Sequence, residues 1–270
     1  MQGSRLPPFL TLLGEVIKML PEPDQSMEIQ GKTALVTGGA RRIGRAISLA
    51  LAAEGMNLVL HYGRSGREAR ETQKAVERLG VRAHLVQAHL EKFSEVNRLI
   101  GQAFRFAPRI HLLVNNASVF YKTPLGKVRE KDWDQFFDIN LKAPFFLSQA
   151  IGLAMVRQRE GKIINLIDWT AFRPRIDFLP YGASKAGLVS LTRGLAKTLA
   201  PHVQVNGIAP GPILPVAGST REEIQKVLKR TPLKRFGDPS DIAEAVRFLV
   251  KSADFVTGAV LPVDGGNLIV

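Results

Sequence analysis

Seven short apolar runs alternate with longer amphipathic segments from Lys32 to the end of the chain, and this alternation limits the fold more than any other feature. Because such runs separated by helical patterns are typical of βαβ units, the strands are expected to run parallel. Nearly continuous apolar stretches favour strands that helices cover on both faces. The runs are TALVT (33–37), NLVLHY (57–62), AHLVQA (83–88), HLLVNN (111–116), KIINLI (162–167), VQVNGI (203–208) and AVLPV (259–263).

The length and composition fit one domain. The chain has 270 residues, of which 45% are hydrophobic and 23% charged, as in a globular protein with a substantial core. It has no internal repeat of fixed period and no low-complexity linker. We therefore expect one doubly wound α/β domain over residues 29–270, built on a seven-stranded parallel sheet.

Residues 1–28 are interpreted as an N-terminal extension. Glu15 and Lys18 interrupt its apolar part and no small-residue cleavage site follows, so a secretion signal is not expected. Two interpretations stay open: Met27 is the natural start of the protein, or the segment is an amphipathic arm.

Composition also argues against several classes of partner. The chain has 37 Lys and Arg residues and 24 Asp and Glu residues, which gives a net charge of +13. The basic residues are scattered, and a short cluster of them lacks aromatic neighbours: Lys229, Arg230, Lys234 and Arg235. Nucleic-acid binding is therefore not expected. The sequence has no run of 18 uncharged apolar residues, so no membrane span is expected. With no cysteine and no paired histidine spacing, we predict no metal site and a cytoplasmic protein.

A glycine-rich turn, TGGARRIG (37–44), follows the first predicted strand and opens the first predicted helix. Glycines permit a tight turn and close backbone approach, and a helix N-terminus offers free N–H groups to a pyrophosphate. This position therefore predicts a dinucleotide-binding turn.

The second predicted strand ends in HYGRS (61–65), where an NAD-binding protein commonly has an acidic residue for the ribose 2′-hydroxyl. No carboxylate is present there. His61, Arg64 and Ser65 offer donors suited to a 2′-phosphate, and Arg41 with Arg42 adds positive charge, so NADPH is favoured over NADH.

The segment YGASK places Tyr181 and Lys185 four residues apart, on one face of a helix. A tyrosine is a poor acid-base catalyst at neutral pH because its ordinary pKa is near 10. The neighbouring Lys185 ammonium and a nicotinamide cation are expected to lower that pKa and make proton transfer feasible.

These motifs together resemble the short-chain dehydrogenase/reductase family over nearly all of residues 30–270. The glycine turn matches the family's TGxxxGxG apart from Arg42, NNAS (115–118) resembles NNAG, and PGP (210–212) and VTGAVLPVDGG (256–266) also match. The resemblance implies a Rossmann domain, a nicotinamide cofactor and a homotetramer, with Asn140 joining Tyr181 and Lys185 in a proton path. For Asn115 and Asn116 a role in locking neighbouring strands is favoured over direct chemistry. The implied cofactor residues are Gly38, Arg41, Arg42, Ile43, Gly44, His61, Arg64, Ser65, Asn116, Ala117, Lys185, Pro210 and Gly211.

One departure narrows the resemblance further. Most relatives have serine where this chain has Asp168, 13 positions before Tyr181. An aspartate there, together with GGARRIG, HYxRS and NNASxFY, resembles pteridine reductases and dihydromonapterin reductases. That resemblance implies a pterin surrounded by Arg42, Ser118, Phe120, Asp168 and Tyr181. Phe120 would stack on the flat heterocycle and Asp168 would pair with its N–H donors.

The sequence therefore predicts an NADPH-dependent reductase that acts on a C=N bond of a dihydropterin or dihydrofolate. The alternative is a carbonyl reductase such as a 3-oxoacyl-[acyl-carrier-protein] reductase, and a dinucleotide sensor without turnover is a third possibility that Tyr181 and Lys185 argue against. His89 and Pro212 with Ile213 depart from family positions near the adenine and the cofactor phosphates. The irregular segment 210–238 is expected to be a binding loop or lid.

Overall fold

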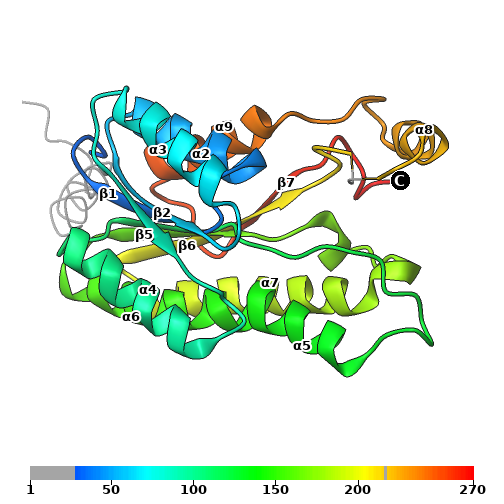
Figure 1. Cartoon of the computed structure of the whole chain (residues 1–270), viewed down its shortest axis with the longest axis horizontal. Helices are drawn as coiled ribbons and strands as arrows, with labels where there is room; N and C mark the ends of the chain where they lie inside the picture. The colour runs from blue at the N-terminus through cyan, green and yellow to red at the C-terminus, as the bar shows by residue number, and fades with distance from the viewer. Residues whose placement is uncertain (1–27, 216–217) are drawn as a thin grey trace, which may run out of the picture.

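A computed structural model describes residues 28–215 and 218–270 (Figure 1). The predicted N-terminal extension therefore lies outside the described residues apart from Glu28, and its division from the domain stays a prediction. The elements in chain order are β1 (Thr33–Val36), α2 (Arg42–Ala53), β2 (Asn57–Tyr62), α3 (Gly66–Glu77), β3 (Ala83–Gln87), α4 (Phe93–Phe106), β4 (Leu112–Asn115), α5 (Glu130–Phe137), the π-helical turn η1 (Asp138–Lys142), α6 (Ala143–Arg157), β5 (Gly161–Leu166), the 3₁₀ turns η2 (Trp169–Ala171) and η3 (Ile176–Phe178), α7 (Leu179–Leu199), β6 (Val203–Pro210), α8 (Arg221–Arg230), α9 (Pro239–Lys251) and β7 (Val260–Val263).

The strands form one sheet in the order β3-β2-β1-β4-β5-β6-β7, and every neighbouring pair is parallel. The predicted Rossmann-type fold is confirmed, and all seven predicted strands are present with ends that differ by no more than two residues. The chain order reverses between β1 and β4. In sheets of this kind the crevice beyond the carboxyl ends at such a reversal is the usual ligand site.

Helices cover both faces of the sheet, as Figure 1 shows, with α2, α3 and α9 on one side and α4, α5, α6 and α7 on the other. Alternate residues of each strand face opposite layers, so a strand between two helical layers must be apolar at every position. In β1, Ala34 and Val36 pack with α2 and α9, whereas Leu35 packs with α4 and α6. This explains the continuous apolar runs in the sequence.

Helix α7 begins two residues before Tyr181. It starts at Leu179, with Pro180 in its first turn, where the fixed φ of proline suits a helix start and its missing N–H costs nothing. As a result, Tyr181 and Lys185 lie on the same buried helix near the carboxyl ends of β4 and β5.

A continuous helical run, Glu130–Arg157, joins α5, η1 and α6. It is long and apolar enough to cross a membrane by length and composition, yet half of its most apolar window is buried inside the fold. Its apolar side chains, including Leu147, Ile151 and Met155, pack against the sheet as a core layer. Among the residues that the structure describes, this run is the single candidate of its kind.

Helix α8 spans REEIQKVLKR within the segment 210–238, and it differs from the other helices because none of its residues is buried. Thr220 and Glu223 form a capping box at its start, and Lys122 pairs with Glu223 at 2.7 Å. In Figure 1, α8 projects beyond the end of the sheet where β7 ends. A role of the segment 210–238 as a lid or binding loop stays a prediction.

Candidate active site

Tyr181 and Asp168 meet at the carboxyl end of β5. The Tyr181 hydroxyl donates a hydrogen bond of 3.0 Å to Asp168 Oδ2, with Tyr181 buried and Asp168 half-buried. Tyr181 comes from the first turn of α7, and Asp168 comes from the loop that follows β5. The structure thus brings together two residues that the sequence analysis placed in one site.

Asp168 is held in position by the turn that it caps. Its Oδ1 accepts hydrogen bonds from the Thr170 backbone N–H at 2.8 Å and from the Thr170 hydroxyl at 2.6 Å. Oδ1 is therefore committed to the protein, while Oδ2 points to Tyr181 and retains a second lone pair. The carboxyl group has one fixed side and one side that is able to receive a further donor.

Burial sets the acid-base properties of this pair. It raises the pKa of Asp168, against the hydrogen bonds from Thr170, the charge of Lys185 and the hydrogen bond from Tyr181. Burial and the Asp168 charge raise the pKa of Tyr181 well above its usual value. In this arrangement of side chains Tyr181 is a neutral phenol that donates to a carboxyl group. The expectation that Lys185 and a nicotinamide cation together lower the Tyr181 pKa concerns the cofactor-bound site and stays a prediction.

Lys185 lies behind the tyrosine ring. Its Nζ donates 2.7 Å to the Leu166 carbonyl at the end of β5 and sits 5.9 Å from the centre of the Tyr181 ring. Burial lowers its pKa to about 8, although the Asp168 charge acts in the opposite direction. The ammonium therefore lies within the same charged environment as Asp168 but does not contact it directly.

Asn140 connects this cluster to the loop after β4. It lies in the π-helical turn η1, a geometry often found at functional sites. Its Oδ1 accepts from the Val119 N–H at 3.0 Å and the Ser118 hydroxyl at 3.1 Å, and its Nδ2 donates to the Val119 carbonyl and to Ser184. The Ser118 hydroxyl in turn lies close enough to Tyr181 to lower the tyrosine's pKa slightly against the larger opposing effects.

The asparagines of NNAS lock strands together. Asn115 donates to Ser148 at 3.0 Å and to Asn165 at 2.8 Å, and Asn165 donates to Thr192 on α7. The Asn116 side chain donates to the carbonyls of Thr37 and Gly38, so it ties β4 to the glycine turn. These contacts agree with the locking role that the sequence favours. Ala117 is bound through its N–H to the Thr37 hydroxyl.

The glycine turn requires glycine at two positions. A Cβ atom on Gly44 would lie 2.0 Å from the Gly38 carbonyl oxygen, and Gly38 itself has φ 62°, a backbone conformation that side chains disfavour. Helix α2 begins just inside this turn, with Ile43 half-buried in its first turn. The crowded glycine contact and the helix start form the cradle that a cofactor pyrophosphate requires.

His61 is not placed to bind a phosphate. Its ring is buried, Nδ1 accepts from the Gly38 N–H at 3.0 Å, and Nε2 lies 3.0 Å from the Ala88 carbonyl. Burial lowers its pKa to about 4, so the ring is neutral and both nitrogens are occupied by the backbone. The prediction of a direct phosphate contact therefore does not fit. His61 instead stabilises the glycine turn by accepting the Gly38 N–H.

Arg64 and Ser65 lie where a 2′-phosphate site requires donors. Arg64 is exposed at the end of β2, and Ser65 stands at the N-terminal boundary of the twelve-residue helix α3 without capping it. Arg41 and Arg42 flank the start of α2, where Arg42 has φ 52°. Within residues 28–215 and 218–270, none of these three arginine side chains has a hydrogen-bonded or ion-paired partner.

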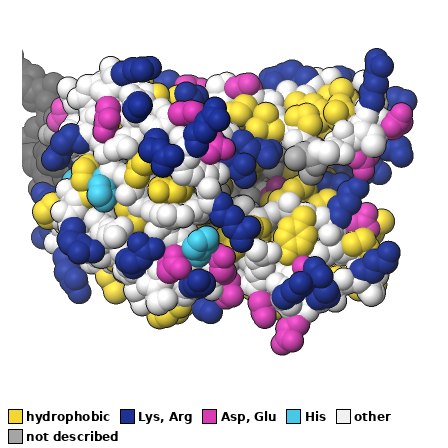
Figure 2. Space-filling view, viewed as in Figure 1, with side chains coloured by type: hydrophobic (Ala, Val, Ile, Leu, Met, Phe, Trp, Pro, Cys, Tyr) yellow, Lys and Arg dark blue, Asp and Glu magenta, His cyan; other side chains and the backbone are white. Residues whose placement is uncertain are grey.

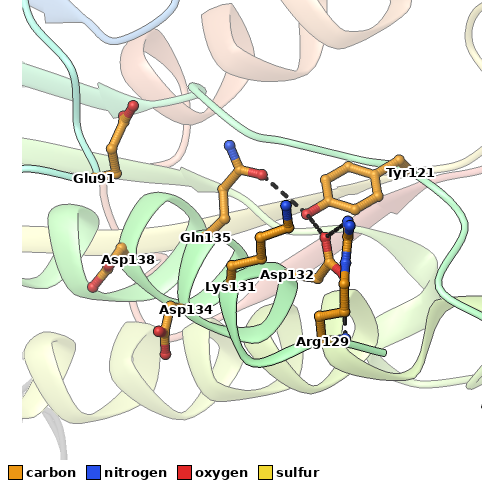
Figure 3. A pocket seen from close by; sticks show the side chains of 8 residues that line it. All are labelled: Glu91, Tyr121, Arg129, Lys131, Asp132, Asp134, Gln135 and Asp138. Carbon is orange, nitrogen blue, oxygen red and sulfur yellow. Dashed lines mark hydrogen bonds and ion pairs between the residues drawn. The ribbon is translucent and has the colours of Figure 1, made fainter. Parts of the chain in front are cut away.

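Phe120 and Tyr121 follow each other in the chain but point into different surroundings. The Phe120 ring stacks on Phe178 at 4.7 Å and meets the edge of Tyr181 at 4.8 Å. Figure 3 shows Tyr121 turned instead toward a hollow beside α5, where its hydroxyl lies 3.0 Å from Gln135 and 3.3 Å from Asp132. Phe120 therefore contacts Tyr181 directly, whereas Tyr121 reaches the same aromatic cluster through Phe136, on which it stacks at 4.5 Å.

The departures from the family pattern have local explanations. The His89 N–H donates to Glu95 and its ring faces Glu91 at 3.6 Å. Ile213 packs into the core and does not face the cofactor crevice, because Gly237 leaves it room. Pro210 ends β6, and Gly211 is confined by the Asp264 backbone, which would lie 2.5 Å from a Cβ atom there.

Several polar partners were not found by sequence reasoning. The motifs assigned no role to Thr170, Asn165, Thr192 or Ser184, although Ser184 lies within YGASK. The fold places these four residues beside Asp168, Asn115 and Asn140. A threonine two residues after a predicted site aspartate, as in DWT, is a usable capping signal. In the part of the chain that the structure describes, no group of three or more acidic or histidine side chains is placed to hold a metal ion.

The seven parallel strands, the glycine cradle and the Tyr181–Lys185 helix define an oxidoreductase fold, and comparison with known families agrees. The model of the short chain dehydrogenase family matches residues 32–226. The chain belongs to the short-chain dehydrogenase/reductase family, whose members use nicotinamide dinucleotides in oxidation and reduction.

Individual relatives point in two directions. The 3-oxoacyl-[acyl-carrier-protein] reductase FabG of Staphylococcus epidermidis is 36% identical over 239 residues, covering 87% of this chain and 98% of that protein. The crystal structure of FolM alternative dihydrofolate reductase 1 from Brucella canis, complexed with NADP, superposes with a TM-score of 0.85 at 34% identity, over 91% of this chain and 97% of that one. A blue fluorescent protein from a metagenomic library, in complex with NADPH, has a TM-score of 0.83 and 35% identity, over 89% and 99%.

Proposed function

We propose that this protein is an NADPH-dependent reductase that adds hydride to a C=N bond of a dihydropterin or dihydrofolate. The observation that carries the proposal is the hydrogen bond from Tyr181 to Asp168, a carboxyl group at a position where most family members have serine. Likeness to a FolM-type dihydrofolate reductase supports the same substrate class.

The chemistry requires one hydride and one proton, delivered to adjacent atoms of the C=N bond. NADPH supplies the hydride when bound. The raised pKa of Tyr181 means that its hydroxyl keeps its proton until hydride addition makes the substrate nitrogen basic, and then donates it. Asp168 holds the tyrosine hydroxyl in place, and its free lone pair accepts an N–H of the heterocycle.

Three other side chains assist. Phe120 offers one ring face to a flat heterocycle, since Phe178 already covers the other. The Ser118 hydroxyl lies beside Tyr181, and Asn140 fixes Ser118 and the Val119 backbone. Lys185, beneath Tyr181, is the residue we assign to the nicotinamide ribose hydroxyls.

NADPH is proposed over NADH because Arg64 and Ser65 stand at the N-terminus of α3 with no carboxylate at the end of β2. A guanidinium fork and a helix N-terminus both favour a phosphate. Similar structures that contain NADP and NADPH support this choice. A homotetramer remains a prediction from the family resemblance, and a cytoplasmic location remains a prediction from the composition.

A carbonyl reductase is the second candidate, favoured by the 36% identity to a 3-oxoacyl-[acyl-carrier-protein] reductase over 98% of its length. In that case Asp168 would only orient Tyr181 toward a carbonyl oxygen. The two candidates differ in what Asp168 contacts, which makes this residue the place to test them.

The deciding experiment compares NADPH oxidation by the purified protein with dihydrobiopterin, dihydrofolate, dihydromonapterin and acetoacetyl thioesters. Asp168→Ser is expected to depress pterin reduction strongly and to spare any weak ketone activity. Phe120→Ala should cost the pterin about 1 to 3 kcal/mol of binding through lost stacking and burial. Efficient thioester reduction without pterin activity at any pH would establish the carbonyl reductase instead.

A further inference from the structure

Arg175 lies next to the proposed substrate site but outside the catalytic group. It precedes η3, and its guanidinium carbon sits 4.4 Å above the centre of the Phe178 ring. Phe178 stacks on Phe120, and Phe120 contacts Tyr181, so two rings connect the Arg175 charge to the catalytic tyrosine. Arg175 therefore lies at the end of an aromatic stack that also contains the ring assigned to the substrate.

The Arg175 guanidinium is half-buried, and among residues 28–215 and 218–270 its side chain has no hydrogen-bonded or ion-paired partner. Burial lowers its pKa, Asp168 and Asp177 oppose that effect through space, and Arg230 of α8 adds to it. A positive charge taken partly out of water, without a contacting carboxylate, is costly for the fold. A ligand anion would remove that cost.

The surroundings fit a ligand that enters from the α8 side. Figure 2 shows the face hollowed between α8 and the helices below it, with hydrophobic side chains inside and Lys and Arg side chains along its border. Arg230, in the last turn of α8, is near enough to Arg175 to influence its pKa. The positive charges of Arg175 and Arg230, which come from two different elements, therefore act on each other beside α8.

We propose that Arg175, supported by Arg230, binds an anionic group on the tail of the substrate and so selects a dihydropterin that carries carboxylates, such as the glutamyl tail of dihydrofolate, over one with an uncharged polyol tail. The inference rests on the proposed pterin function and adds to it the charge of the tail. Planar guanidinium groups are well suited to bidentate carboxylate binding, which favours Arg175 for this contact.

The test measures kcat/KM with NADPH for dihydrofolate and for dihydrobiopterin, whose tail is neutral. In the wild type the ratio should favour dihydrofolate and fall as salt concentration rises, because the tail contact is ionic. R175Q should lower the ratio about tenfold and weaken its salt dependence, while Arg175→Lys should restore part of it. R173Q is the matched control, because Arg173 lies in the same loop but donates to the Asn267 carbonyl; its ratio should equal that of the wild type.

A binding measurement separates tail recognition from chemistry. Folate titrated into the enzyme with NADP⁺, followed by quenching of tryptophan fluorescence, should bind R175Q about tenfold more weakly than R173Q. If both pterins are reduced but R175Q leaves the ratio and folate affinity unchanged, the tail site is refuted and the pterin function stands. If neither pterin is reduced while acetoacetyl thioesters are, the proposed function fails and the inference fails with it.

Discussion

The catalytic group and the predicted 2′-phosphate loop lie beyond the carboxyl ends of two strands of the same sheet, β5 and β2, yet they differ in burial and in hydrogen bonding. Tyr181, Lys185 and Asn140 are buried and Asp168 is half-buried, and each is fixed by at least one hydrogen bond to another part of the chain. Arg64 is exposed and Ser65 leaves its helix uncapped, and neither side chain has such a bond among the residues that the structure describes.

The fold alone fixes the positions of the catalytic side chains, whereas we expect the side chains of the 2′-phosphate loop to become ordered only when the ligand binds. A proton donor has to be aligned before the reaction, so its hydrogen-bond partners are built into β5 and α7. A phosphate is recognised by charge and by several flexible donors, so its arginines can stay solvated until binding. Changes in the buried group should therefore affect turnover, and changes in the loop should affect cofactor affinity.

The largest effect is expected from Tyr181→Phe. The ring and its contacts with Phe120 and Phe136 remain, but the hydroxyl that donates to Asp168 is lost. Turnover should fall by about two or more orders of magnitude, with the fold and NADPH affinity retained. Steady-state rates, circular dichroism and cofactor titration check this result. Near-normal turnover in a folded variant would rule out the proposed proton donor.

Arg64→Ala should have the opposite profile. Loss of a charge-assisted phosphate contact costs about 1.5 to 3 kcal/mol, so NADPH affinity should fall roughly ten- to a hundredfold while NADH affinity changes little. Isothermal titration with both dinucleotides measures the two constants. Equal losses for both cofactors would mean that Arg64 does not read the 2′-phosphate.

The pH dependence of kcat/KM should reflect the ionisation of the buried Lys185 and not that of the 2′-phosphate loop. Because burial lowers the pKa of Lys185 to about 8, the ammonium loses its proton above that pH, and kcat/KM should fall by about tenfold per pH unit. NADPH affinity should not fall with pH in the same way, because Arg64 keeps its charge throughout this pH range. A rate profile that stays flat to pH 9.5 would contradict the assignment of Lys185.

The smallest effect concerns stability. Burial raises the Asp168 pKa in the folded state, so the stability that its neutral form contributes at low pH is lost as the pH rises through that folded pKa. Asp168→Asn removes this loss of stability. If the free energy of unfolding rises by about 1 kcal/mol, Tm should rise by about 2–4 °C at pH 7.5. Pterin turnover should be lower in the same variant. The gain should shrink as the pH approaches 4. A lower Tm at pH 7.5 would show that the charged carboxyl stabilises the fold.

The sequence predicted the sheet well because apolar strands between two helical layers leave an unmistakable pattern, as in KIINLI and HLLVNN. It also placed Tyr181 and Lys185 correctly, since a four-residue spacing fixes a shared helix face. The prediction for His61 was wrong. Histidine can donate to a phosphate, but the His61 ring on β2 contacts the Gly38 N–H and the Ala88 carbonyl instead. Burial and long-range partners such as Thr192 depend on packing, which no local spacing encodes.

The π-helical turn at Asp138–Lys142 divides the run Glu130–Arg157 into two helical phases. A π-helical turn contains one residue more than an α-helical turn, and each α-helical residue rotates the chain by about 100°. Deleting one residue from the turn would restore an ordinary helix and swing either α5 or α6 to a new face. The inserted residue thus lets α6 keep its core side chains against the sheet while Asn140 faces Val119 and Ser184.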